Sequence, residues 1–137
     1  MILFEDIRKN FPESLSIEKN SRDMIKEALQ YKALEIIFNR KEQSGFVFIG
    51  GTSLRIFHGI KRFSEDLDFD LLPGNKYDLK DHEKLLEIIA KEFRKEGYDV
   101  ESSCKETTRS VLTGKGLEYQ LKTKTNPKDV VILKIEM

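Results

Sequence analysis

The sequence predicts an α+β (mixed α/β) domain in which helices pack on a mixed β-sheet. Up to Lys95, apolar residues recur mainly at helical spacing, interrupted by two short apolar runs. After Gly97 the spacing changes to every second residue, which is typical of strands. At 137 residues, 39% of them hydrophobic, the chain suits a single domain with one core, spanning 1–137. The expected order is helix, strand, helix, strand, helix and then several strands.

Two helices are expected before the first strand. A short one lies around Phe4–Lys9 and is followed by a turn at Phe11-Pro12. Ser21 is expected to cap a second helix that runs to about Arg40, because a serine hydroxyl can accept a bond from an N–H of the first turn. Apolar residues recur in this helix at helical spacing: Ile25, Leu29, Ala33, Ile36 and Ile37.

Two further helices follow the first strand. Thr52–Phe57 is expected to be helical, with three side chains turned toward the core: Leu54, Ile56 and Phe57. A longer helix is expected to begin at Asp78 or Asp81 and to run through Lys95, with Gly97 as its stop. One face of that helix carries Leu85, Leu86, Ile89 and Phe93.

Short strands are predicted on both sides of the last helix. Phe46–Ile49 is expected to be a buried strand that the following glycines end, and Leu67–Leu72 a second strand closed by Pro73-Gly74. The alternating C-terminal region gives four more expected strands: Tyr98–Ser102, Thr108–Leu112, Leu117–Leu121 and Val130–Met137.

Composition excludes several classes of protein. Lys plus Arg equals Asp plus Glu at 24 each, so no bulk field attracts nucleic acid or an anionic membrane. The single cysteine, Cys104, excludes an internal disulfide and a cysteine-based zinc site. No apolar run approaches the about 20 residues that span a bilayer, and we expect a cytoplasmic protein without membrane contact. Five lysines between positions 115 and 134 form either a nucleic-acid surface or solubilising charges: Lys115, Lys122, Lys124, Lys128 and Lys134.

A glycine pair follows the first expected strand, in the tetrapeptide Gly50-Gly51-Thr52-Ser53. Glycines at a strand-to-helix turn allow backbone N–H groups to approach a phosphate, and the two hydroxyls add donors. An ordinary turn is the alternative interpretation. The segment is not a P-loop, because no Gly-Lys-Ser/Thr follows at the required spacing.

Acidic residues alternate in the strand that follows. Asp66, Asp68 and Asp70 share one face, while Leu67 and Phe69 face the core. Carboxylates grouped on one face repel one another unless water or a cation neutralises them. They can therefore bind a divalent cation such as Mg²⁺ or Mn²⁺ and the phosphates it bridges, or they form a solvated acidic strand.

A site for two metal ions and phosphoryl transfer needs a third carboxylate from a neighbouring strand, and Glu136 is the best candidate. An ordinary strand glutamate is the alternative. Arg55, Lys61 and Arg62 lie near the predicted site in sequence and can neutralise phosphate oxygens. Arg62 can equally pair with a neighbouring carboxylate, that of Glu65 or Asp66. His58 is expected to pack at the end of the short helix.

Two segments together resemble the signature of a known family. They are Phe48-Ile49-Gly50-Gly51-Thr52-Ser53-Leu54-Arg55 and Arg62-Phe63-Ser64-Glu65-Asp66-Leu67-Asp68-Phe69. In order and spacing they are similar to the AbiEii/AbiGii-type nucleotidyltransferases, toxins of bacterial type IV toxin–antitoxin and phage-abortive systems. The resemblance is specific over residues 46–70 and looser elsewhere.

The resemblance implies a DNA polymerase β-like nucleotidyltransferase fold, with a mixed sheet flanked by helices. By position, it implies that nucleoside triphosphate is bound by Gly50, Gly51, Thr52, Ser53, Arg62 and Ser64. It also implies that Asp66, Asp68 and Glu136 are the catalytic metal ligands. Family members continue with a helical C-terminal region, and the strand-like end at Met137 leads us to expect that this region lies beyond the chain.

The function expected from the resemblance is transfer of a nucleotide from an NTP to RNA, such as a tRNA end, or to a protein. An antitoxin is the expected partner. Two alternatives stay open: a non-catalytic, truncated relative that binds a partner, and an antibiotic-modifying nucleotidyltransferase with the same metal residues.

Overall fold

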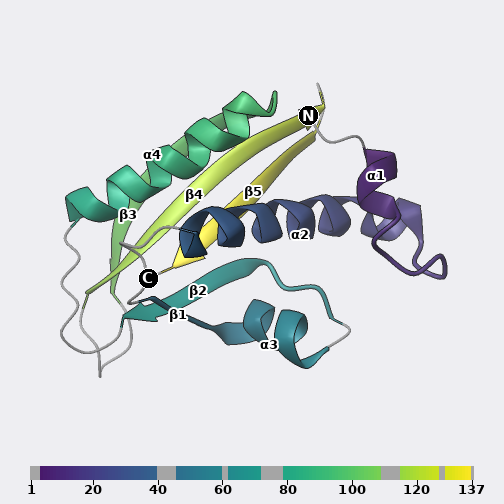
Figure 1. Cartoon of the computed structure of the whole chain (residues 1–137), viewed down its shortest axis with the longest axis horizontal. Helices are drawn as coiled ribbons and strands as arrows, with labels where there is room; N and C mark the ends of the chain where they lie inside the picture. Colours follow the sequence, from purple (N-terminus) through teal and green to yellow (C-terminus); the bar gives the residue numbers. More distant parts are fainter. Residues whose placement is uncertain are drawn as a thin grey trace.

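The computed structural model describes residues 4–39, 46–59, 62–71, 79–108, 115–126 and 129–136. These ranges contain four helices and five strands in the predicted order (Figure 1). The helices are α1 (Phe4–Arg8), α2 (Ile17–Phe38), α3 (Gly50–His58) and α4 (Leu79–Lys95). The strands are β1 (Phe46–Ile49), β2 (Asp66–Leu71), β3 (Asp99–Thr108), β4 (Lys115–Asn126) and β5 (Asp129–Glu136).

All five strands form one sheet in the order β1-β2-β5-β4-β3. Only the β2–β5 pair is parallel; the other three pairs are antiparallel. The mixed sheet expected from the sequence is therefore confirmed. The parallel pair lies inside the sheet and joins residues that are 68 positions apart in the chain, such as Asp66 and Lys134.

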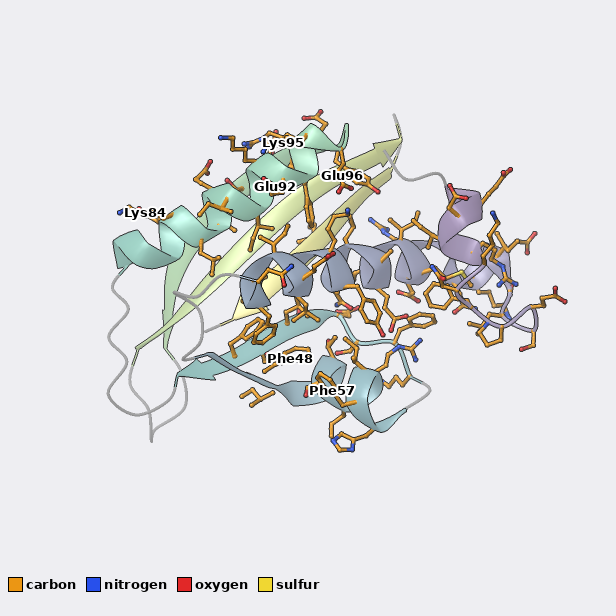
Figure 2. All side chains as sticks on the ribbon, in the orientation of Figure 1. Phe48, Phe57, Lys84, Glu92, Lys95 and Glu96 are labelled. Atoms are coloured by element: carbon orange, nitrogen blue, oxygen red, sulfur yellow. The ribbon has the colours of Figure 1, made fainter. Side chains whose placement is uncertain are left out.

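The core lies between the sheet and the two long helices, α2 and α4, which lie against the same side of the sheet (Figure 1). Leu67 and Phe69 of β2 are fully buried there, as is Ile135 of β5. The predicted inner face of α4 is confirmed, because its four apolar residues, Leu85, Leu86, Ile89 and Phe93, are buried. Lys84 and Lys95 project from the opposite side of α4 (Figure 2).

Helix α2 begins earlier than predicted. Its N-cap is Ser16, whose side chain accepts a bond from the backbone N–H of Lys19 at 3.4 Å, whereas Ser21 lies inside the helix. Regular apolar spacing starts only at Met24, because the residues from Glu18 to Asp23 are all polar or charged. Hydrophobic periodicity therefore placed the start of α2 too late.

Helix α3 presents a different face to the core from the one predicted. Ile56 packs against the core, as expected, but Leu54 and Phe57 are 47% and 69% exposed. Thr52, which is 1% exposed, lies four residues before Ile56 and occupies the same inner stripe. The prediction was wrong because it assumed that apolar residues, rather than this threonine, define the inner face. His58 is also exposed rather than packed.

Two strand predictions need correction. The segment Phe46–Ile49 is an edge strand, and its described side chains, Phe48 and Ile49, are half-buried rather than buried. The polar segment between positions 102 and 108 continues β3 instead of forming a turn, because all ten residues of β3 pair with β4. Thr108 therefore ends β3, and the remainder of the predicted strand to Leu112 lies outside the described residues.

Within the described ranges, no helix combines the length and apolar character needed to cross a bilayer.

Candidate active site

The glycine turn lies directly beside the acidic strand. Strand β1 ends at Ile49, which pairs with Asp68 of β2, and α3 begins at the next residue, Gly50. Gly50 has a positive φ of 82°, and a Cβ added to it would lie 2.3 Å from Oδ2 of Asp68. Contact with this carboxylate therefore requires glycine at position 50, for steric as well as conformational reasons.

The N-terminus of α3 thus lies beside the Asp68 carboxylate. The first N–H groups of a helix have no partner within the helix, and the helix dipole favours negative charge at this end. Ile49 occupies the cap position, and its side chain makes no capping hydrogen bond. A phosphate beside a cation held by Asp68 would meet both the dipole and these donors.

The two hydroxyls of the turn make contacts within the protein. Thr52 Oγ1 donates to the backbone carbonyl of Asp66, and Ser53 Oγ donates to the carbonyl of Phe48 at 3.3 Å. These bonds attach α3 to both strands of the β1–β2 pair. A nucleotide-binding role of Thr52 and Ser53 stays a prediction, since their hydroxyl protons already have partners in this arrangement.

The two aspartates occupy the face of β2 opposite the core. Asp66 and Asp68 are half-buried, whereas the residues that alternate with them, Leu67 and Phe69, are fully buried. The alternation predicted from the sequence is therefore observed. The third aspartate of the strand, Asp70, has a side chain outside the described set.

Strand β5 places the backbone of Glu136 next to Asp68. The parallel register pairs Leu67 with Ile135 and Asp68 with Glu136. Paired positions share a sheet face, and Ile135 is buried with Leu67, so position 136 lies on the face of the two aspartates.

The side chain of Glu136 lies outside the described set. Among the described residues, no three His, Cys, Asp or Glu side chains form a group that could hold a metal ion. The three-carboxylate metal site therefore stays a prediction, supported by the backbone register.

Ser64 and Arg62 are the other two residues predicted to contact the nucleotide, and Ser64 lies beside the glycine turn. A Cβ added to Gly51 would lie 3.1 Å from Ser64 Oγ, so this hydroxyl lies against the glycine pair. Arg62, two residues earlier, is exposed to solvent. Lys61, which was predicted to neutralise phosphate, lies outside the described residues.

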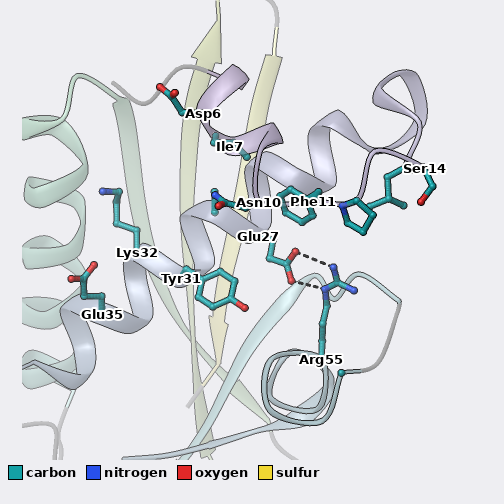
Figure 3. A pocket seen from close by; sticks show the side chains of 14 residues that line it. Asp6, Ile7, Asn10, Phe11, Ser14, Glu27, Tyr31, Lys32, Glu35 and Arg55 are labelled. Carbon is teal, nitrogen blue, oxygen red and sulfur yellow. Dashed lines mark hydrogen bonds and ion pairs between the residues drawn. The ribbon is translucent and has the colours of Figure 1, made fainter.

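Arg55 of α3 pairs with a buried carboxylate of α2. Its guanidinium pairs with Glu27 of α2 through two bonds, Nε to Oε1 at 2.5 Å and Nη2 to Oε2 at 3.1 Å (Figure 3). It also lies over the ring of Phe63, with Cζ 4.2 Å from the ring centroid. Arg55 therefore joins α2 to α3, and the phosphate role predicted for it stays a prediction.

Two polar residues of α2 were missed by the sequence analysis. Glu27 and Gln30 are only 5% and 1% exposed, and Gln30 Nε2 donates to the carbonyl of Ser64 at 2.9 Å. A signal was present: both residues lie on the apolar stripe of the helix, where charged or amide side chains are unusual.

Tyr31 lies near Glu27 and Arg55. Burial raises the pKa of Tyr31, the Glu27 carboxylate raises this pKa further, and the Arg55 charge lowers it.

A cavity of about 1140 Å³ lies beside the Glu27–Arg55 ion pair, between α1, α2 and the C-terminal half of α3 (Figure 3). Glu27, Tyr31 and Arg55 line it together with residues of the α1–α2 connection. Arg8 shapes that connection by donating to four backbone carbonyls, those of Phe11, Pro12, Glu13 and Leu15. Among the described lining residues, Arg55 alone was predicted to contact phosphate, and neither aspartate nor the glycine turn is included.

Comparison with known proteins assigns the chain to a family and agrees with the fold. A search of curated proteins finds no match to the chain. Residues 32–137, by contrast, match the model of a family described as the nucleotidyl transferase AbiEii toxin of type IV toxin–antitoxin systems. The matched segment includes the glycine turn, the aspartate pair and Glu136. The chain therefore belongs to the AbiEii family of nucleotidyl transferase toxins.

Proposed function

We propose that this chain transfers a nucleotide from a nucleoside triphosphate to an RNA acceptor, with Asp66, Asp68 and Glu136 as ligands of Mg²⁺ or Mn²⁺. The observation that supports this proposal best is the contact between Gly50 and the Asp68 carboxylate. It brings a helix N-terminus, which favours phosphate, next to a carboxylate, which favours a divalent cation. A metal–triphosphate complex needs both.

The residues present fit such a complex. Carboxylate oxygens are the ligands that Mg²⁺ prefers, and the absence of a side chain at Gly50 keeps the Asp68 carboxylate accessible from the turn. Gly51 and Ser64 border the same turn, and exposed Arg62 can supply positive charge to phosphate oxygens. When bound, Mg²⁺ neutralises triphosphate charge and favours ionisation of the acceptor hydroxyl.

The reaction exchanges a phosphoanhydride bond of the NTP for a phosphodiester bond to the acceptor. An acceptor hydroxyl oxygen bonds to the α-phosphorus, the bond between the α- and β-phosphates breaks, and pyrophosphate leaves while the hydroxyl proton passes to solvent. The contribution of the protein is positioning and charge stabilisation. The N-terminus of α3 orients the phosphates, and β2 with β5 holds the carboxylates.

The test uses NTPs carrying a radioactive label on either the α- or the γ-phosphate, incubated with the protein, total RNA and Mg²⁺. We expect the α-label, and not the γ-label, to enter RNA. Chelation of the metal or the double change Asp66→Asn/Asp68→Asn should abolish incorporation. Asp99→Asn, which removes an exposed carboxylate from the far edge strand β3, is the matched control and should retain it.

Two outcomes count against the proposal. Transfer of the γ-label would indicate a kinase reaction. Absence of both transfer and metal-dependent NTP binding would remove the enzymatic function. If the label enters protein or an aminoglycoside instead of RNA, the chemistry stands and the acceptor is corrected.

A second candidate function is binding of a partner protein, the antitoxin of the system. Leu54 and Phe57, exposed side by side on the outer face of α3, favour it, because exposed apolar groups mark interaction surfaces. Co-purification of the antitoxin with the Asp66→Asn/Asp68→Asn variant, and its loss with Leu54→Ser/Phe57→Ser, would support direct binding. Retention of the antitoxin by the latter variant would exclude this surface.

A further inference from the structure

Helix α2 carries two buried polar side chains on one face. Glu27 and Gln30 are 5% and 1% exposed and lie three residues apart, so they are neighbours on the helix surface. Burying a carboxylate or an amide is unfavourable unless hydrogen bonds replace the lost water. Both side chains form such hydrogen bonds, and their partners belong to segments that build the acidic site.

Gln30 holds the segment that leads into the acidic strand. Its Nε2 donates to the backbone carbonyl of Ser64, two residues before Asp66. The hydroxyl of the same Ser64 lies against Gly51 of the turn. One amide of α2 therefore fixes a residue that contacts the glycine turn on one side and precedes the aspartates on the other.

Glu27 holds the helix that begins at the glycine turn. Its carboxylate forms two bonds to Arg55, which lies five residues after Gly50 on α3. The Arg55 guanidinium in turn covers the ring of Phe63, the neighbour of Ser64. The contacts of Glu27 and Gln30 thus meet again in the 62–65 segment, and the buried ion pair connects α2 to α3 (Figure 3).

We propose that Glu27 and Gln30 are positioning residues of the nucleotide site, which set the α3 N-terminus and the 62–65 segment at the correct distance from Asp66 and Asp68. The inference rests on the proposed function. Both residues precede the segment 32–137 that matches the family model, so the match does not include them. Since misplacing a reacting group by about 1 Å can reduce a rate about 100-fold, loss of either contact should act through geometry.

The first test compares Gln30→Met with Lys32→Met. Methionine preserves length and volume but removes the amide donor. Lys32 lies on the same helix but pairs with Glu96, the residue after α4, away from the site. The change Lys32→Met therefore also removes one polar contact of α2, but in a different region. Nucleotide transfer is measured where circular dichroism shows both variants folded. We expect Gln30→Met to reduce kcat/KM for NTP about 10- to 100-fold, mainly through kcat, and Lys32→Met to stay within about twofold.

The second test does not require activity. Hydrogen exchange of the whole protein is followed by mass spectrometry for peptides covering 50–66 and 79–96. Gln30→Met and Glu27→Gln should speed exchange in 50–66 alone, and Lys32→Met in 79–96 alone. Unchanged exchange in 50–66, or an unchanged kcat/KM in both Gln30→Met and Glu27→Gln, would overturn the positioning role. Absence of transfer by the unmodified protein, with faster exchange in 50–66 of the variants, would count against the proposed function and leave the positioning role standing.

Discussion

Gly50 lies in direct contact with the carboxylate of Asp68, at a distance that excludes any side chain: a Cβ at position 50 would lie 2.3 Å from Oδ2. The same residue has a φ of 82°, a conformation that non-glycine residues adopt only with strain. Strand, helix and acidic residue meet at this point. The geometry of the site depends on this one missing side chain.

Replacing Gly50 with alanine should therefore disrupt the site twice. The positive φ should cost about 1–2 kcal/mol of unfolding free energy, and the new methyl group should displace the Asp68 carboxylate. We expect loss of metal-dependent NTP binding, measured by isothermal titration calorimetry, together with a lower unfolding free energy in urea.

Gly59→Ala is the control for this change. Gly59 ends α3 with a φ of 68°, but a Cβ there would meet no atom within 4 Å. It should lose about the same 1–2 kcal/mol and retain NTP binding. Equal binding by both alanine variants would show that the contact between Gly50 and Asp68 is unimportant for the ligand.

The sequence was sufficient to predict elements whose pattern is local. The alternation of Asp66 to Phe69 predicted which face of β2 is buried, because the side-chain period of a strand is fixed. The four apolar residues of α4 predicted its inner face for the same kind of reason. The glycine turn and the aspartates could be recognised as one site because order and spacing place them at the two ends of one short connection.

Features that depend on partners distant in sequence were not predictable in this way. The pairs of Glu27 with Arg55 and of Gln30 with Ser64 join residues 28 and 34 positions apart, and no local rule pairs them. The inner face of α3 was predicted wrongly because Thr52 is buried for a hydrogen bond to β2 rather than for its hydrophobicity. Polar burial of this kind is fixed by tertiary contacts.

Thr52 should contribute to stability through that hydrogen bond. Thr52→Val keeps the shape but removes the hydroxyl that donates to the Asp66 carbonyl, at a residue that is 1% exposed. We expect a loss of about 1–3 kcal/mol in urea unfolding. Thr52→Ser, which keeps the hydroxyl, should recover most of the difference. If Thr52→Val is as stable as the unmodified protein, the bond contributes nothing measurable.

The predicted cation should stabilise the folded protein. A ligand that binds only the folded state at about a hundredfold excess over its Kd adds about 2.7 kcal/mol. We expect Mg²⁺ to raise the Tm of the protein and to leave the Tm of Asp68→Asn unchanged, in scans at constant ionic strength. Ca²⁺ should be compared with Mg²⁺. An equal rise in both proteins would assign the effect to cations bound elsewhere.

Phe69 connects the core to the edge strand. Phe69 is fully buried, and the centroids of the Phe69 and Phe48 rings are 5.4 Å apart. The centroid of the Phe48 ring is in turn 6.1 Å from that of the exposed Phe57 ring. Phe69→Ala should cost about 3–5 kcal/mol of unfolding free energy. Phe57→Ala, at 69% exposure, should cost less than about 1 kcal/mol. Chemical denaturation of the two variants measures the contrast, and comparable losses would contradict the described burial.

Tyr31 should make stability depend on pH in the alkaline range. Burial, and then the Glu27 carboxylate, raise the pKa of its hydroxyl above the ordinary 10.0, against the lowering effect of Arg55. The folded state therefore holds the phenolic proton more tightly than the unfolded chain. This contribution is complete below about pH 10 and is lost as the pH rises through the folded-state pKa.

Tyr31→Phe removes the titrating group and should remove this part of the pH dependence. The measurement is urea unfolding at several pH values on both sides of the ordinary tyrosine pKa, with tyrosinate absorbance of the folded protein as a direct reading of the titration. Glu27→Gln removes a carboxylate that raises the pKa, so the Tyr31 transition should move to lower pH. A Tyr31 transition that stays in place or moves to higher pH in Glu27→Gln would contradict the effect assigned to the Glu27 carboxylate.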